Sequence, residues 1–233
     1  MSGHLESERT AILRAALPHV PFDGWSAKTL KSAVRDAGLD PAMAQRAFPG
    51  GPRELADYLA ADADRRMVEA LATRNLEELP IRERIATAVR VRLELLAPHR
   101  DALRLSLALR LRPGSAPHTM RAMYQTVDAM WRAAGDTSTD FNFYTKRGLL
   151  AGVYGATLLY WLDDESEDFT ETWAFLDRRI ENIMRIQDVR HRLEKFRVVL
   201  PSLAKLRPRN PLDAARAARW ATRPIFRGRR RRP

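Results

Sequence analysis

The feature that most constrains the fold is a helical spacing of apolar residues, which continues along most of the chain between turn signals. Residues 8–20 place Ile12, Leu13 and Leu17 on one face of a helix. The same spacing predicts further helices at about 53–75, 80–96, 99–111, 116–134, 140–162 and 168–195. We find no two-residue alternation typical of a strand and no internal repeat. The sequence therefore predicts an all-α protein.

The first fifty residues carry the signals of a helix-turn-helix unit. Ser26 suits the N-cap of the next helix, and Gly38 stands where a helix end needs a left-handed residue. Asp40 and Pro41 predict the N-cap and first residue of a third short helix that ends at Phe48. This three-helix pattern resembles the N-terminal domain of the TetR repressor family, whose third helix enters the major groove of DNA.

The third short helix offers little chemistry for binding DNA. Recognition requires donors directed at bases and phosphates, and only Gln45 and Arg46 provide them in this helix. Asp36 and Asp40 precede the helix and would repel phosphate. We therefore expect a scaffold element and no nucleic-acid partner. A TetR-like DNA-binding transcriptional regulator is kept as the alternative function.

Composition removes several catalytic and metal-site chemistries. The chain has no cysteine, which excludes disulfides, thiolate nucleophiles and cysteine-based zinc sites. Its five histidines are scattered, and none has a second metal ligand at helical spacing. No glycine motif that binds phosphate is present. We therefore predict a protein that is not an enzyme, with no catalytic residues, no metal and no cofactor.

Two segments gather more aromatic and charged residues than helix packing requires. Residues 130–147 read Met-Trp-Arg-Ala-Ala-Gly-Asp-Thr-Ser-Thr-Asp-Phe-Asn-Phe-Tyr-Thr-Lys-Arg, with four aromatic residues and a turn around a helix start. Residues 168–179 read Asp-Phe-Thr-Glu-Thr-Trp-Ala-Phe-Leu-Asp-Arg-Arg. Together they resemble the ubiquinone-biosynthesis accessory family commonly called Coq-nine. The resemblance covers about residues 8–186 and includes the helix-turn-helix start.

The resemblance implies a non-catalytic protein with a TetR-like fold that dimerises and binds isoprenoid lipids. Members assist the hydroxylase that acts on demethoxyubiquinone, by associating with the membrane and presenting the quinone. The family's docking site for this hydroxylase matches Met130, Trp131, Asp136, Asp140, Asn142, Phe143, Tyr144 and Arg147. The family often has Trp at position 143, so this chain keeps an aromatic anchor without the indole N–H. The alternative is that Trp131, Phe141 and Tyr144 only close the end of the helical core.

A lipid-binding cavity is expected in the predicted helices 99–111, 116–134 and 140–162. These helices are rich in flexible apolar side chains, and a polyprenyl chain needs a long apolar slot. Spacing alone does not distinguish a slot from a filled core, and the resemblance favours the slot. The predicted lining residues are Leu105, Leu109, Met123, Val127, Met130, Leu150, Val153, Tyr154 and Leu158.

A homodimer is expected through the predicted helices 140–162 and 168–189, as in TetR-like proteins. Gly148, Gly152 and Gly155 would permit a close helix approach there. The alternative is that these glycines pack against another helix of the same chain. The 15 uncharged residues from Gly148 to Leu162 fall short of the ~18 needed for a membrane span, which predicts a core helix.

The C-terminal segment is strongly basic. Residues 190–233 hold 15 Lys or Arg and two acids, a net charge of +13, whereas the first 189 residues carry −2. Apolar residues interleave with the basic ones, a pattern typical of helices that lie in a membrane interface. The predicted membrane-binding residues are Lys195, Phe196, Arg197, Val199, Leu200, Leu203, Lys205, Leu206, Arg207 and Trp220. A solvated tail and a non-specific DNA-binding segment are the alternatives.

Three regions follow from these patterns. We predict a helix-turn-helix-like unit at 8–52, a helical lipid-binding and dimerisation body at 53–189, and a basic amphipathic membrane-associating tail at 190–233. The polar N-terminus predicts neither a secretory signal nor a transit peptide. We therefore expect a cytoplasmic protein that lies peripherally on the cytoplasmic face of a bacterial inner membrane. Its expected partners are an isoprenoid quinone or precursor, an anionic membrane surface and the hydroxylase.

Overall fold

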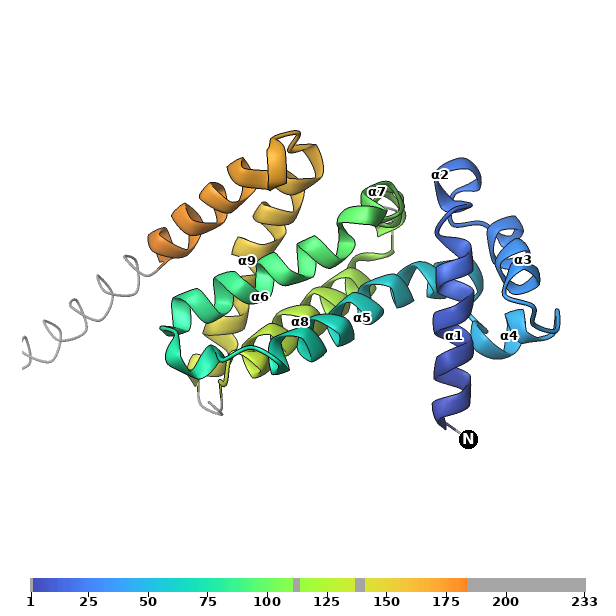
Figure 1. The fold of residues 1–233 in the computed structure, drawn as a ribbon, viewed down its shortest axis with the longest axis horizontal. Helices are drawn as coiled ribbons and strands as arrows, with labels where there is room; N and C mark the ends of the chain where they lie inside the picture. The colour runs from blue at the N-terminus through green and yellow to red at the C-terminus, as the bar shows by residue number, and fades with distance from the viewer. Residues whose placement is uncertain (1, 111–113, 137–140, 184–233) are drawn as a thin grey trace, which may run out of the picture. The chain divides into compact units, whose positions relative to one another are not determined.

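A computed structural model describes residues 2–110, 114–136 and 141–183, with only the backbone given for residues 2, 3, 141 and 142. The chain divides into two units, 1–183 and 184–233, and the described residues all lie in the first (Figure 1). All regular structure in these residues is helical, which confirms the all-α prediction. No helix in this part of the chain is long and apolar enough to cross a membrane. The predicted membrane-binding residues from Lys195 to Trp220 lie outside the described residues.

The helix-turn-helix unit contains four helices in the part of the chain that the structure describes. They are α1 (Ser2–Ala16), α2 (Val20–Asp23), α3 (Ala27–Asp36) and α4 (Met43–Ala47). The Ser26 Oγ accepts a hydrogen bond from the Thr29 N–H at 3.1 Å, which confirms the predicted N-cap of α3. Gly38 takes a φ of +67°, the left-handed conformation expected after α3.

Two boundaries in this unit differ from the prediction. The single helix expected at 8–20 is two helices, because the chain turns at residues 17–19 between α1 and α2. The helix expected to begin at Pro41 begins at Met43. Asp40 does not act as its N-cap, because the Asp40 Oδ1 accepts from the Ala42 N–H at 2.8 Å and closes a turn before the helix.

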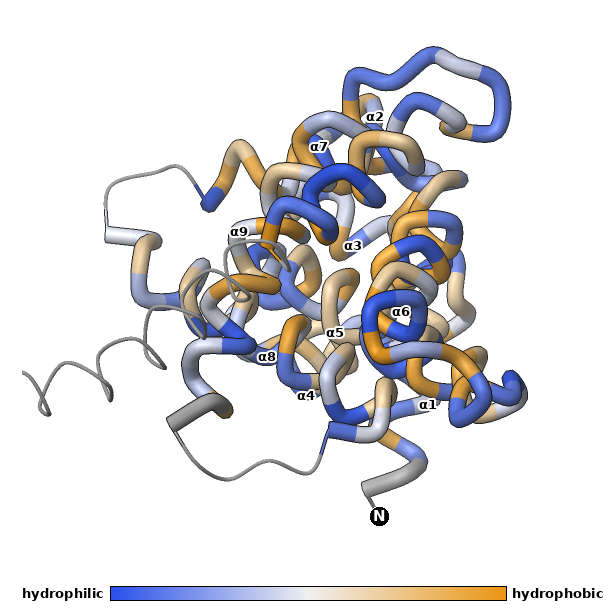
Figure 2. Tube along the Cα trace, turned by 90° about the vertical axis from the view of Figure 1, so that its left-hand side faces the viewer, coloured by the Kyte–Doolittle hydropathy of each residue, from blue (hydrophilic) through white to orange (hydrophobic). Residues whose placement is uncertain are grey.

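The described part of the body contains five further helices of 11 to 23 residues. They are α5 (Gly51–Ala72), α6 (Ile81–Leu96), α7 (Arg100–Arg110), α8 (Ala116–Ala133) and α9 (Phe141–Asp163), and residues 170–183 are also helical. Helix α5 packs against both α6 and α8, and α8 packs against α9 (Figure 1). Helix α5 also contacts α1 and α3 and thereby joins the helix-turn-helix unit to the body. Viewed after a quarter turn, apolar segments of α5 and α8 lie inward (Figure 2).

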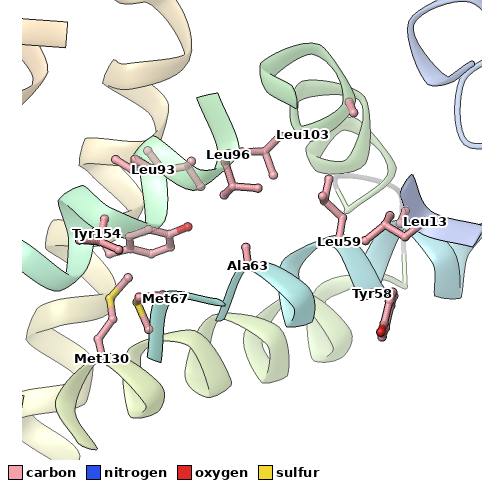
Figure 3. Close-up of a cluster of buried hydrophobic side chains, with 14 of the residues drawn as sticks. Leu13, Tyr58, Leu59, Ala63, Met67, Leu93, Leu96, Leu103, Met130 and Tyr154 are labelled. Atoms are coloured by element: carbon pink, nitrogen blue, oxygen red, sulfur yellow. The ribbon is translucent and has the colours of Figure 1, made fainter. Parts of the chain in front are cut away.

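The core of the body is a continuous layer of apolar side chains. Figure 3 shows Leu59, Ala63 and Met67 along α5, facing Leu93 and Leu96 of α6. Each of these five side chains is buried. Burying a side chain as large as leucine or methionine stabilises the fold by roughly 1.5–3 kcal/mol. The apolar stripes that predicted the helices are therefore also the main source of stability.

A buried hydrogen bond connects the helix-turn-helix unit to α7. The Trp25 Nε1 donates to the Ala102 carbonyl at 2.9 Å. On the other side, the Arg9 guanidinium lies 4.7 Å from the Phe48 ring centroid and 4.6 Å from the Tyr58 ring centroid. These contacts fix the helix-turn-helix unit to the body through the side chains of Arg9, Trp25, Phe48 and Tyr58 and the Ala102 carbonyl of α7.

Candidate functional site

The site begins where α8 ends. Gly135 has a φ of +86°, a left-handed conformation that residues with a Cβ rarely adopt. The Asp136 N–H then donates to the Trp131 carbonyl at 3.0 Å, which closes the helix end. The Arg84 Nη1 donates to the Ala134 carbonyl at 3.2 Å. This termination directs Asp136 back toward the first turns of α9.

Arg147 is the centre of the site. Its side chain is only 3% exposed. The Arg147 Nε donates to the Asp128 Oδ1 at 2.7 Å, and its Nη1 donates to the Asp136 Oδ2 at 3.4 Å. The same Nη1 donates to the Phe143 carbonyl at 3.2 Å, and the guanidinium lies 3.3 Å from the Phe143 ring centroid. Arg147 therefore connects α8, the turn after it and α9.

Lys146 and Trp131 add a second set of contacts between the two helices. The Lys146 Nζ donates to the Asp136 Oδ1 at 2.8 Å. It also lies 5.5 Å from the Trp131 ring centroid, and the Trp131 Nε1 donates to the Lys146 carbonyl at 3.2 Å. Two cations thus share the Asp136 carboxylate, whose side chain is 6% exposed. We name Asp128, Trp131, Asp136, Phe143, Tyr144, Lys146 and Arg147 the α8–α9 cluster.

Tyr144 is the outward-facing member of the α8–α9 cluster. It is 70% exposed, whereas Trp131 and Phe143 are half-buried. The Phe143 and Tyr144 rings meet edge to face with centroids 5.2 Å apart. The exposure of Tyr144 means that this residue does not close the core, in contrast to the alternative interpretation of the sequence. A rigid ion-paired base beneath an exposed aromatic ring suits recognition of another protein.

The structure brings together five of the predicted partner-binding residues. Trp131, Asp136, Phe143, Tyr144 and Arg147 all belong to the α8–α9 cluster. Asp140 and the side chain of Asn142 lie outside the described residues. In the part of the chain that the structure describes, no group of three or more His, Asp or Glu side chains could hold a metal ion.

The predicted lipid-lining residues lie mostly in packed surroundings. The buried ones are Val127, Met130, Leu150, Val153, Tyr154 and Leu158. Leu109 and Met123 are half-buried, and Leu105 is 37% exposed. The four pockets described for residues 2–183 are lined by other residues. The cavity therefore stays a prediction.

A buried polar network in the same helices was not predicted from the sequence. Arg92 is 2% exposed, and its Nε donates to the Asp64 Oδ1 at 2.6 Å. Its Nη1 donates to the Tyr154 hydroxyl, and the Thr126 hydroxyl donates to the Asp64 Oδ2 at 2.9 Å. Burial raises the pKa of Tyr154, so its phenol is neutral at pH 7. The sequence signal that could have identified this network is the position of Arg92 on the apolar stripe of α6, between Val89 and Leu96.

Comparisons with known proteins bear on this region directly. Residues 116–187 match the family model described as COQ9, the family called Coq-nine above, and the α8–α9 cluster falls within them. The chain is 36% identical over 182 residues to "Ubiquinone biosynthesis protein COQ9, mitochondrial" of Rattus norvegicus, covering 75% of this chain and 58% of that protein. The Homo sapiens protein of the same name is 34% identical, with 75% and 57% covered. The chain thus spans less than two thirds of the length of these relatives.

A solved structure has a similar fold. The crystal structure of the TetR transcriptional regulator from Nitrosomonas europaea matches with a TM-score of 0.62 and 25% sequence identity. The match covers 74% of this chain and 95% of the regulator. Together with the family model and the relatives, this match shows that the chain carries a COQ9 family domain at residues 116–187 and has a TetR-like fold.

Proposed function

We propose that this chain is a non-catalytic accessory protein of ubiquinone biosynthesis. The names of its curated relatives support the pathway. The observation that carries the proposal is the α8–α9 cluster, which lies inside the matched family segment and displays Tyr144 above buried ion pairs. The described residues hold no metal cluster, and we propose no chemical step for them.

The α8–α9 cluster is the proposed docking site for the hydroxylase of demethoxyubiquinone. Arg147 and Asp136 hold the base of the cluster, so docking requires little further ordering of these side chains. Tyr144 is the proposed anchor, because an exposed tyrosine supplies a large apolar area and a hydroxyl at low entropic cost. Interface energy concentrates in a few such residues.

The rest of the proposal concerns lipid and membrane. An isoprenoid quinone or precursor is the proposed ligand of the helical body, and the basic segment 190–233 is proposed to hold the protein on an anionic membrane surface.

A homodimer through α9 and the 170–183 helix is also proposed. The outer side of this pair supports it, since Leu159 is 64% exposed and Tyr160 stacks on Phe175 with centroids 4.6 Å apart. Trp161, also on α9, is fully buried within its own chain and is therefore not part of the proposed dimer interface.

The docking proposal is tested by measuring binding of the purified hydroxylase to the immobilised full chain. Tyr144→Ala is expected to weaken binding by about tenfold, the loss typical of a hot-spot aromatic residue. Tyr124→Ala is the matched control, because Tyr124 is a 44% exposed tyrosine on α8 outside the cluster. Equal binding by the two variants would remove the α8–α9 cluster as the docking site.

The lipid proposal is tested by organic extraction and mass spectrometry of the purified full chain. A stoichiometric isoprenoid quinone or precursor supports the carrier function. An empty extract, repeated after incubation with quinone-loaded liposomes, removes it. Loss of liposome binding on deletion of 190–233 supports the membrane function of that segment.

A TetR-like transcriptional regulator is the second candidate function. The fold of the Nitrosomonas europaea regulator favours it. Asp36, which hydrogen-bonds His19 at 2.7 Å, and the five-residue length of α4 both disfavour phosphate and base contacts. Protection of a defined palindromic DNA by the purified protein would favour the regulator.

A further inference from the structure

A pocket of about 270 Å³ lies at the junction of the helix-turn-helix unit and the body. Its walls come from α1, α5 and the end of α6, and its apolar lining consists of Leu13, Leu17, Leu59, Ala63, Leu95 and Leu96. Figure 3 shows Leu13 beside Leu59, with Leu96 and Ala63 farther along the same layer. The pocket is smaller than the ~300–1,000 Å³ of sites for drug-sized ligands, so its ligand is small.

The polar lining of this junction pocket carries an excess of positive charge. Arg14 and Arg66 are exposed, and Asp62 is the acid that accompanies them. The Arg65 Nη2 donates to the Asp62 Oδ1, whereas the Arg66 Nη1 remains 3.9 Å from the Asp62 Oδ2. Arg65 thus compensates Asp62 from outside the pocket. Within residues 2–183 as described, Arg14 makes no ion pair.

His99 supplies a neutral hydrogen-bonding group to the same pocket. Burial lowers the pKa of His99, and the nearby charge of Arg66 lowers it further. The imidazole is therefore neutral at pH 7 and offers one donor and one acceptor. The two guanidinium groups remain as the positive charges of the lining, at the edge of an apolar interior.

We propose that the junction pocket binds a small amphipathic carboxylate. The apolar part of the ligand lies among the leucine side chains, and its carboxylate pairs with Arg14 and Arg66. A neutral isoprenoid gains nothing from two guanidinium groups, so this site is separate from the proposed quinone site. Because α1 and α5 both contribute walls, the ligand stabilises the junction between the helix-turn-helix unit and the body.

The test is calorimetric titration of the purified full chain with octanoate. Octanamide is the matched neutral probe, and inorganic phosphate is the matched anion without an apolar part. Arg14→Gln and Arg66→Gln each remove one charge from the lining. Arg82→Gln is the control, since Arg82 is a 63% exposed arginine in the first turn of α6, away from Leu95 and Leu96.

We expect one saturating octanoate site per chain, with octanamide at least tenfold weaker and phosphate without effect. Arg14→Gln and Arg66→Gln each weaken octanoate affinity by about fivefold, because each removes one solvent-screened charge. Arg82→Gln leaves the octanoate affinity unchanged. Circular dichroism checks that each variant is folded. If Arg66→Gln is unfolded, the affinity of Arg14→Gln decides the test. Absent saturation, equal binding of octanamide, competition by phosphate, or unchanged affinity in both lining variants overturns the proposal.

Discussion

The substitution Arg147→Gln tests whether buried ion pairs hold the α8–α9 cluster together. The Arg147 guanidinium loses its bonds to Asp128 at 2.7 Å and Asp136 at 3.4 Å. Removing one partner of a buried pair costs about 3–5 kcal/mol. Each carboxylate keeps a second cation, Arg132 for Asp128 and Lys146 for Asp136, both at 2.8 Å. We therefore expect a loss at the lower end, about 3 kcal/mol.

The loss of unfolding free energy is measured by urea unfolding of the full chain, monitored by circular dichroism. In a chain of this size, about 3 kcal/mol lowers Tm by about 6–12 °C. Arg132→Gln is the control, because Arg132 pairs with the same Asp128 carboxylate at 2.8 Å but is 73% exposed. An exposed pair of this kind contributes below about 1 kcal/mol. The two variants thus differ in the burial of the arginine and in the further bonds of Arg147 to Asp136 and the Phe143 carbonyl.

Two results would refute this reasoning. Equal destabilisation by Arg147→Gln and Arg132→Gln would show that burial of the guanidinium does not set the energy. A double-mutant cycle of Arg147→Gln with Asp128→Asn measures the coupling between the two groups directly. Additive effects in that cycle would show that the 2.7 Å contact contributes no interaction energy of its own.

Two further predictions concern other buried charges. Arg92→Met is expected to lower the free energy of unfolding by about 3–5 kcal/mol in urea, because it leaves the Asp64 carboxylate without its 2.6 Å partner. Adding Asp64→Leu should restore part of that loss. Further destabilisation by the second substitution would contradict the pairing. Asp164 is 5% exposed, and hydrogen bonds from Ser166 and Thr172 outweigh burial and lower its pKa to about 2. The ionised carboxylate contributes about 1–2 kcal/mol of stability above the ordinary pKa of 3.8, and this contribution is lost as pH falls toward 2. The difference in unfolding free energy between the unmodified chain and Asp164→Asn should therefore narrow between pH 3.8 and pH 2. A constant difference would be the contrary result.

The two ends of α3 were predictable because their chemistry is local. Ser26 caps α3 through a backbone N–H three residues away, and Gly38 needs only its own φ of +67°. The same holds for Gly135 at the end of α8. Each of these residues acts on atoms within a few positions in sequence, so one sequence suffices to identify it. Five members of the α8–α9 cluster, by contrast, were predicted through a family resemblance, and Asp128 and Lys146 were not predicted.

Groups whose partners are distant in sequence were not predictable in this way. Arg92 meets Asp64 28 positions earlier and Tyr154 62 positions later, and spacing gives no register between α5, α6 and α9. Asp164 lies in a run of acidic residues, yet it is buried, and Thr172 donates to it through both its backbone N–H and its hydroxyl. Side-chain burial depends on which helices meet, and apolar periodicity leaves this choice open.

The contacts that set the fold and the proposed docking surface are formed by different residues. The TetR-like architecture rests on buried contacts such as the Trp25 hydrogen bond to the Ala102 carbonyl, which joins the helix-turn-helix unit to α7. The matched COQ9 segment, 116–187, lies wholly outside that unit and holds the exposed Tyr144 and the Arg147 ion pairs. A core of this kind constrains volume and polarity but leaves surface chemistry free. A regulator-like scaffold can therefore carry the proposed docking surface without rebuilding its interior.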